Sequence, residues 1–146
     1  MFATQKSGAL IWDPSTGKHQ LLNNTLLVDS FCSAPVIIPE TGDIIMPGGD
    51  ARFGRGQNKG IVDAPILDSD TLELRHGADK SFARWYPTAT TLPNGEILVT
   101  GGIDGAGNVS YTPEIYNPRA DEWRSLLGID GRRVFSRGAN RWFYPR

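Results

Sequence analysis

The chain has 146 residues, of which 39% are hydrophobic and 21% charged, and its formal net charge is −1. This length and composition predict one globular domain, residues 1–146, and the near-neutral charge gives no electrostatic basis for binding nucleic acid. A single cysteine excludes an internal disulfide and a cysteine-rich metal cage, and no apolar run is long enough to predict a membrane-spanning helix.

A strand–turn–strand design occurs three times along the chain. Its copies are IWDPSTGKHQLL at 11–22, PILDSDTLELRHG at 65–77 and EIYNPRADEWRSL at 114–126. In each copy an apolar strand leads into a polar turn, and a second short strand follows. Asp13-Pro14 and Asn117-Pro118 are strong turn signals, because proline fixes φ and the Asp or Asn side chain bonds its own backbone.

A second unit alternates with the first. IPETGDIIMPGGD at 38–50 matches LPNGEILVTGGID at 92–104, and the glycine pairs that end these apolar strands are 53 residues apart. The final residues, RWFYPR at 141–146, are similar to RWYPT at 84–88, as though a third copy began there. A period near 50 residues with paired glycines after an apolar strand is the kelch pattern of β-propellers.

The number of repeats predicts an incomplete propeller. Propellers close with typically four to eight blades of about 50 residues each, so this chain supplies roughly two and a half to three. The sequence therefore predicts an all-β, kelch-type fold that is a fragment of a larger propeller, because open blades leave strand edges exposed. Completion by oligomerisation is the alternative.

Two chemically distinctive residues lie at the same phase of successive repeats. Cys32 is the only cysteine and precedes one glycine-pair strand, and Tyr86 precedes the next. Stacked blades bring such positions close together around the propeller axis. A thiol and a phenol so placed are candidate partners, although a lone cysteine is more often a small buried hydrophobic residue.

The segments FCSAPVIIPETGDIIMPGGD, ARWYPTATTLPNGEILVTGG, PEIYNP and RWFYPR together resemble the galactose oxidase and glyoxal oxidase family of copper radical oxidases. The resemblance covers about residues 10–146 and implies the N-terminal part of the propeller. It implies that Cys32 forms a thioether to the ring of Tyr86, whose phenolate is an equatorial copper ligand. The sulfur substituent makes the phenolate easier to oxidise to a radical.

The same resemblance implies a copper cofactor, but it places the remaining ligands later in a family member. Two histidines and an axial tyrosine complete the family's site, whereas His19 and His76 here match no family motif. A single phenolate holds copper poorly, so we expect these 146 residues alone to bind little or no copper and to be inactive.

The function expected for the full-length protein is oxidation of aldehydes or primary alcohols by O₂, with release of hydrogen peroxide. Galactose oxidase has a tryptophan near the position of Ile103-Asp104, so the difference favours a glyoxal-oxidase-like substrate. The alternative is a non-catalytic kelch module that binds a protein partner. The oxidase interpretation predicts a secreted protein with a signal segment upstream of this chain, and without that segment a cytoplasmic one.

Overall fold

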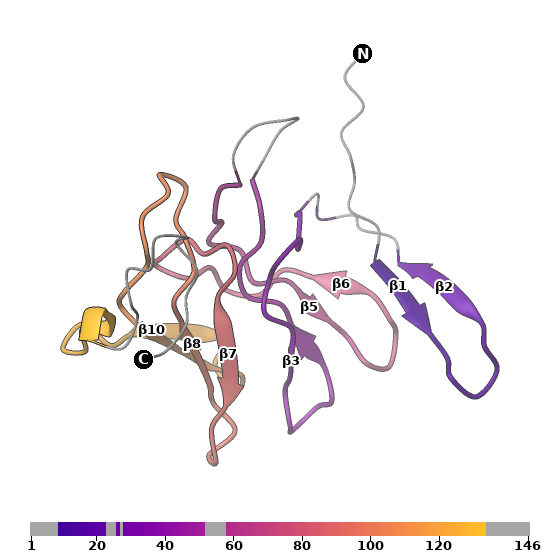
Figure 1. The fold of residues 1–146 in the computed structure, drawn as a ribbon. Coiled ribbons are helices and arrows are strands. Elements are labelled where there is room, and N and C mark those ends of the chain that lie inside the picture. Colours follow the sequence, from indigo (N-terminus) through magenta and orange to yellow (C-terminus); the bar gives the residue numbers. More distant parts are fainter. Residues whose placement is uncertain (1–8, 23–25, 27, 52–57, 134–146) are drawn as a thin grey trace.

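The computed structural model describes residues 9–22, 26, 28–51 and 58–133, and this part of the chain is almost entirely β-structure (Figure 1). A two-stranded hairpin comes first, formed by β1 (Ala9–Trp12) and β2 (His19–Leu22). Blade 1 consists of β3 (Val36–Ile37), β4 (Ile44–Ile45), β5 (Ile66–Leu67) and β6 (Leu74–Arg75). Blade 2 consists of β7 (Thr88–Thr91), β8 (Ile97–Thr100), β9 (Glu114–Asn117) and β10 (Glu122–Ser125). A 3₁₀ helix, η1 (Gly131–Arg133), follows.

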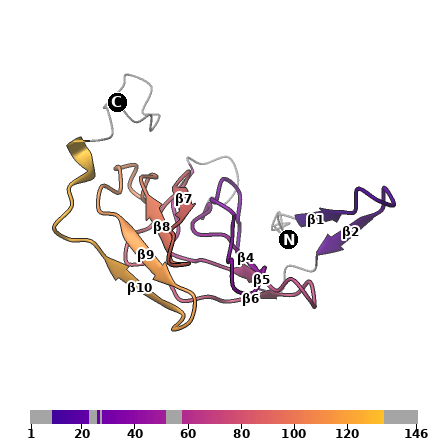
Figure 2. The same ribbon diagram turned by 90° about the horizontal axis from the view of Figure 1, so that it is seen from below.

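Each blade is a four-stranded antiparallel sheet whose strands follow one another in chain order. The β1–β2 hairpin and η1 lie at opposite ends of the row of sheets (Figure 2). The first strands of the two blades, β3 and β7, contact each other. Two complete blades and a two-stranded hairpin confirm the predicted all-β, partial kelch propeller. The segment RWFYPR at 141–146, where the sequence indicates the start of a third copy, lies outside the described residues.

The three predicted turns close three equivalent hairpins. Asp13 accepts a hydrogen bond from the main-chain N–H of Ser15 at 2.8 Å, and Asn117 accepts one from Arg119 at 3.0 Å. Asp68, in the middle copy, accepts one from Thr71 at 2.8 Å. Residues Glu122–Ser125, which follow the turn at Asn117, form strand β10, as the sequence predicts. A short side-chain acceptor at the same turn position therefore shapes all three copies.

Buried and half-buried residues alternate along β8, the strand that ends at the second glycine pair, and its buried residues form part of the core. Ile97 and Val99 on β8 are fully buried, while the residues between and after them are half-buried. They join a core cluster of Ile38, Ile45, Ala64, Ile66 and Tyr116, which spans both blades. Strand β8 lies between β7 and β9, so it is paired along both edges.

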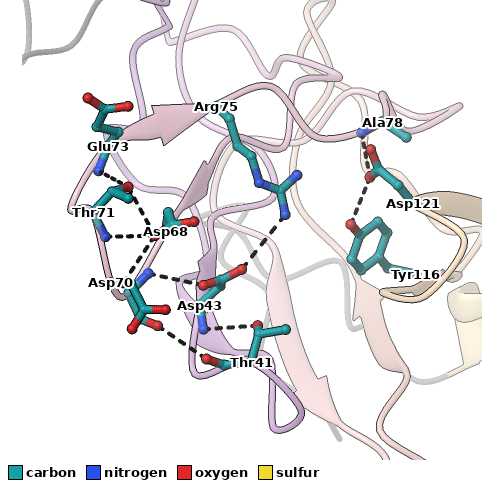
Figure 3. A network of polar contacts seen from close by, with 11 residues as sticks. Thr41, Asp43, Asp68, Asp70, Thr71, Glu73, Arg75, Ala78, Tyr116 and Asp121 are labelled. Atoms are coloured by element: carbon teal, nitrogen blue, oxygen red, sulfur yellow. Dashed lines mark hydrogen bonds and ion pairs between the residues drawn. The ribbon is translucent and has the colours of Figure 1, made fainter.

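Carboxylates at the turns fasten the sheets to their connections (Figure 3). Asp43 accepts a hydrogen bond from the main-chain N–H of Ser69 at 3.0 Å, which ties the β3–β4 turn to the β5–β6 turn. Asp121 accepts hydrogen bonds from the Tyr116 hydroxyl at 2.7 Å and from the Ala78 N–H at 3.0 Å. Asp121 thus joins blade 2 to the segment that follows the last strand of blade 1.

Candidate functional site

Cys32 and Tyr86 occupy equivalent positions at the start of successive blades. Cys32 lies just before β3 and Tyr86 just before β7, and both have φ of 59°. Non-glycine residues rarely adopt this left-handed conformation, because Cβ crowds the following carbonyl. The same strained turn therefore presents a thiol on one blade and a phenol on the next.

The structure brings these two side chains together. The main-chain N–H of Tyr86 donates a hydrogen bond to the Cys32 carbonyl oxygen at 3.0 Å. A hydrogen bond between the Cys32 side chain and the Tyr86 phenol raises the pKa of that phenol. The Cys32 side chain is half-buried, and Tyr86 is 44% exposed. The pair is therefore in contact and open to solvent.

The segment around Tyr86 lies between close main-chain neighbours. The Trp85 ring meets the Tyr86 ring edge-on, with centroids 4.6 Å apart and an interplanar angle of 88°. Trp85 and Ile103 exchange two main-chain hydrogen bonds of 2.8 Å each. The connection that follows β8 therefore fixes the backbone next to Tyr86.

Glycines make this close approach possible. A Cβ added to Gly48 would lie 2.5 Å from the Arg84 carbonyl oxygen, and one added to Gly102 would lie 2.9 Å from the Arg84 Cβ. Both glycines belong to the repeated pairs, and both have positive φ. The repeated glycine pairs therefore leave room for the backbone that carries Arg84.

No sequence motif assigns a role to Arg84, but in the structure it is fully buried directly before Trp85 and Tyr86. Its guanidinium forms an ion pair of 2.9 Å with Glu114, which is also fully buried. Burial lowers the pKa of Arg84, and the hydrogen bond that Arg84 donates to Glu114 opposes that shift. One sequence feature could have pointed to Arg84: Arg-Trp precedes Tyr-Pro twice, at 84–87 and at 141–145.

The site is separate from a cavity that lies beside blade 2. That cavity has a volume of about 660 Å³, and Phe82, Ser110 and Leu127 are among the residues that line it. Neither Cys32 nor Tyr86 lines it. Because Tyr86 is exposed, the thiol–phenol pair is a surface site.

Comparison with known proteins places this geometry in context. Residues 84–126 match the Kelch motif. The chain is 29% identical over 119 residues to a galactose oxidase of Gibberella zeae, covering 79% of this chain and 16% of that protein. It is 30% identical over 105 residues to the aldehyde oxidase GLOX of Vitis pseudoreticulata, covering 72% of this chain and 19% of that protein. These matches support a relationship to the galactose oxidase- and glyoxal oxidase-like kelch proteins.

A solved structure confirms the fold of this kelch protein. A fungal alcohol oxidase of the AA5 family, solved in complex with copper, superposes with a TM-score of 0.70 at 21% identity, covering 92% of this chain and 27% of that one. The kelch protein thus spans less than a fifth of each curated relative reported above. The one helix among the described residues is the three-residue η1, which is too short to cross a membrane.

The donor atoms of the kelch protein fit one part of a copper site. Tyr86 is an exposed residue with a phenol oxygen, a ligand type that suits Cu(II) together with imidazole. His19 and His76 are exposed on β2 and after β6. Within the ranges that the structure describes, no three His, Cys, Asp or Glu side chains form a group able to hold a metal ion. The thiol–phenol pair fits the family's cross-link, and further ligands would come from outside these ranges.

Proposed function

We propose that Cys32 and Tyr86 form the thioether cofactor of a copper radical oxidase, and that this chain is the N-terminal part of that enzyme's propeller. The observation that carries the proposal is the contact between the Cys32 thiol and the Tyr86 phenol, which equivalent turns of adjacent blades present to each other. The similarity to galactose oxidase and to the aldehyde oxidase supports it.

The covalent step joins the Cys32 sulfur to the Tyr86 ring carbon next to the hydroxyl. The S–H and the ring C–H bonds break, and the two protons and two electrons pass to O₂, giving hydrogen peroxide. The main-chain N–H of Tyr86 donates to the Cys32 carbonyl oxygen at 3.0 Å, which keeps the two residues side by side. Proximity of this kind replaces a bimolecular encounter by an intramolecular one.

In the complete enzyme, Tyr86 would be a copper ligand and, after cross-linking, the group that is oxidised to a radical. Copper would supply a second one-electron centre, so that the site takes two electrons from each substrate molecule and returns them to O₂. The exposed phenol leaves room for a small substrate to approach. Further blades would supply the imidazole ligands.

The proposed substrates are aldehydes or primary alcohols, with the glyoxal-oxidase-like branch favoured. The preference rests on Ile103-Asp104, which lies near the point where galactose oxidase has a tryptophan; the main chain of Ile103 pairs with Trp85. The indole beside Tyr86 therefore comes from the preceding residue, and it meets the phenol edge-on. The proposal therefore favours a small aldehyde or alcohol over a sugar.

The test is copper-dependent hydrogen peroxide production by the full-length protein, with a small aldehyde, a primary alcohol and galactose as substrates. We expect Tyr86→Phe to abolish activity and Cys32→Ser to reduce it strongly. Tyr111→Phe, at a half-buried tyrosine in a blade 2 connection, is the matched control and should leave activity unchanged. Absence of activity in the copper-loaded wild type, with an unmodified Cys32, would favour a non-catalytic kelch module.

A further inference from the structure

Arg84 donates all its side-chain hydrogen bonds to groups of blade 2 and its connections. Its Nη1 donates to the carbonyl oxygens of Gly101 and Ser110, and its Nη2 donates to the Thr112 carbonyl oxygen. Its Nη2 and Nε donate to one carboxylate oxygen of Glu114, at 2.9 and 3.3 Å. The guanidinium therefore holds together the ends of β8 and β9.

The main chain of Arg84 is bonded to the connections of blade 1. Its N–H donates to the Ile61 carbonyl oxygen at 2.9 Å, and its own carbonyl accepts from the Gly49 N–H at 3.0 Å. Gly49 follows β4, and Ile61 lies in the connection between β4 and β5. Arg84 thus connects the two blades two residues before the Tyr86 N–H reaches the Cys32 carbonyl oxygen.

Energetics favour a positioning role over a stabilising one. Burying a guanidinium and a carboxylate costs much of what their attraction returns, and well-packed apolar residues often stabilise a core as well. The planar guanidinium, however, bonds three carbonyl oxygens and one carboxylate in a fixed geometry that an apolar side chain cannot provide. The network therefore specifies where the backbone before Tyr86 runs.

We propose that Arg84 is the positioning residue of this site: by bonding both blades it sets the separation of Cys32 and Tyr86, and Glu114 holds its guanidinium in place. The proposal deepens the proposed function and rests on it for its catalytic meaning. Its structural content, that Arg84 fixes the Tyr86 backbone against Cys32, can be measured without copper.

The first variant is Arg84→Lys in the full-length protein, produced without copper. An ammonium cannot reach Gly101, Thr112 and Glu114 together, so the Tyr86 amide should exchange with solvent at least about tenfold faster, while the amides of Ile97 and Val99 on β8 keep their rates. When copper and O₂ are added, the Cys32–Tyr86 thioether should form about 100-fold more slowly, as a displacement near 1 Å can cause. Peptide mass mapping follows the thioether.

Two comparisons isolate the cause. Arg124→Lys changes an exposed arginine whose ion pair with Glu96 has the same 2.9 Å length, and it should leave both readouts at wild-type values. If Arg84→Lys unfolds, the double variant Arg84→Met/Glu114→Leu removes both buried charges together and should still speed Tyr86 exchange and slow the thioether.

Wild-type exchange at the Tyr86 amide in both the single and the double variant would overturn the positioning role. Wild-type exchange combined with slow thioether formation would also overturn it, because the defect would then lie elsewhere. A wild-type protein that never forms the thioether would instead sink the proposed function, and amide exchange would still decide the structural part.

Discussion

Glu114→Gln tests how strongly the buried ion pair beside Tyr86 supports the fold. One carboxylate oxygen of Glu114 accepts from the main-chain N–H of Ser81 at 2.7 Å, and the other accepts from Arg84. A glutamine has one oxygen and one NH₂ group, so either Ser81 or Arg84 faces a donor. Arg84 also loses the only carboxylate that the structure places against its guanidinium. Removing one partner of a buried pair costs about 3–5 kcal/mol, and we expect the lower end because the amide keeps one acceptor.

That loss is large against the 5–15 kcal/mol that typically stabilise a domain. With a urea m-value of about 2 kcal/mol per molar, a 3 kcal/mol loss lowers the midpoint of urea unfolding by about 1.5 M. Tryptophan fluorescence can follow the transition, since Trp85 and Trp123 are half-buried.

Glu96→Gln is the matched control for this measurement. The Glu96–Arg124 pair has the same 2.9 Å length, but the Arg124 side chain is 55% exposed. Exposed pairs contribute little to stability, so the midpoint should barely move. Equal midpoint shifts for the two variants would refute the reasoning, because burial would then not decide the energy of the pair.

Two further predictions concern the glycines and a buried lysine. Gly49→Ala should destabilise the chain by about 3 kcal/mol or more, because its φ is 145° and its Cβ would collide with the Asp29 carbonyl oxygen. Gly17→Ala, with φ of 70° and nothing within 4 Å, should cost only about 1 kcal/mol of backbone strain in the same urea assay. Burial lowers the pKa of Lys80 to about 7 from its ordinary 10.5, so between these pH values the unfolded chain binds more protons and the free energy of unfolding rises with pH. The rise should reach at most about 1.4 kcal/mol per pH unit, and Lys80→Met should remove it.

Each of these predictions has a contradicting result. Equal losses for the two alanine variants would mean that backbone conformation alone, without close contact, determines the cost. A free energy of unfolding that falls between pH 7 and 10 in the wild type, or an unchanged slope in Lys80→Met, would contradict the assignment to Lys80.

The fold could be predicted because its signals are local. Asp13-Pro14 and Asn117-Pro118 specify hairpin turns through their own backbone angles and short side chains, and the glycine pairs mark strand ends. Because these signals repeat at a fixed spacing, the sequence predicts that Cys32 and Tyr86 lie at equivalent positions of successive repeats. No sequence signal showed that both have left-handed backbones, because neither is the glycine that normally indicates this conformation.

The support of the site could not be predicted, because it depends on distant groups. Arg84 bonds the carbonyl oxygens of Gly101, Ser110 and Thr112, which lie 17 to 28 residues away and have no side-chain signature. Glu114 is the first residue of strand β9, and it meets its ion-pair partner Arg84 only in the folded chain. Such partners become visible only when blade 2 is folded and its connections come together around Arg84.

The most direct test of the central proposal is peptide mass mapping of the protein from its natural source, together with its intact mass. The proposal predicts a mass well above 16.0 kDa, with the peptides of Cys32 and Tyr86 joined and lighter by the two hydrogens that the new bond displaces. Separate peptides with a free Cys32 thiol would contradict it, and they would leave a kelch module whose partner remains to be found.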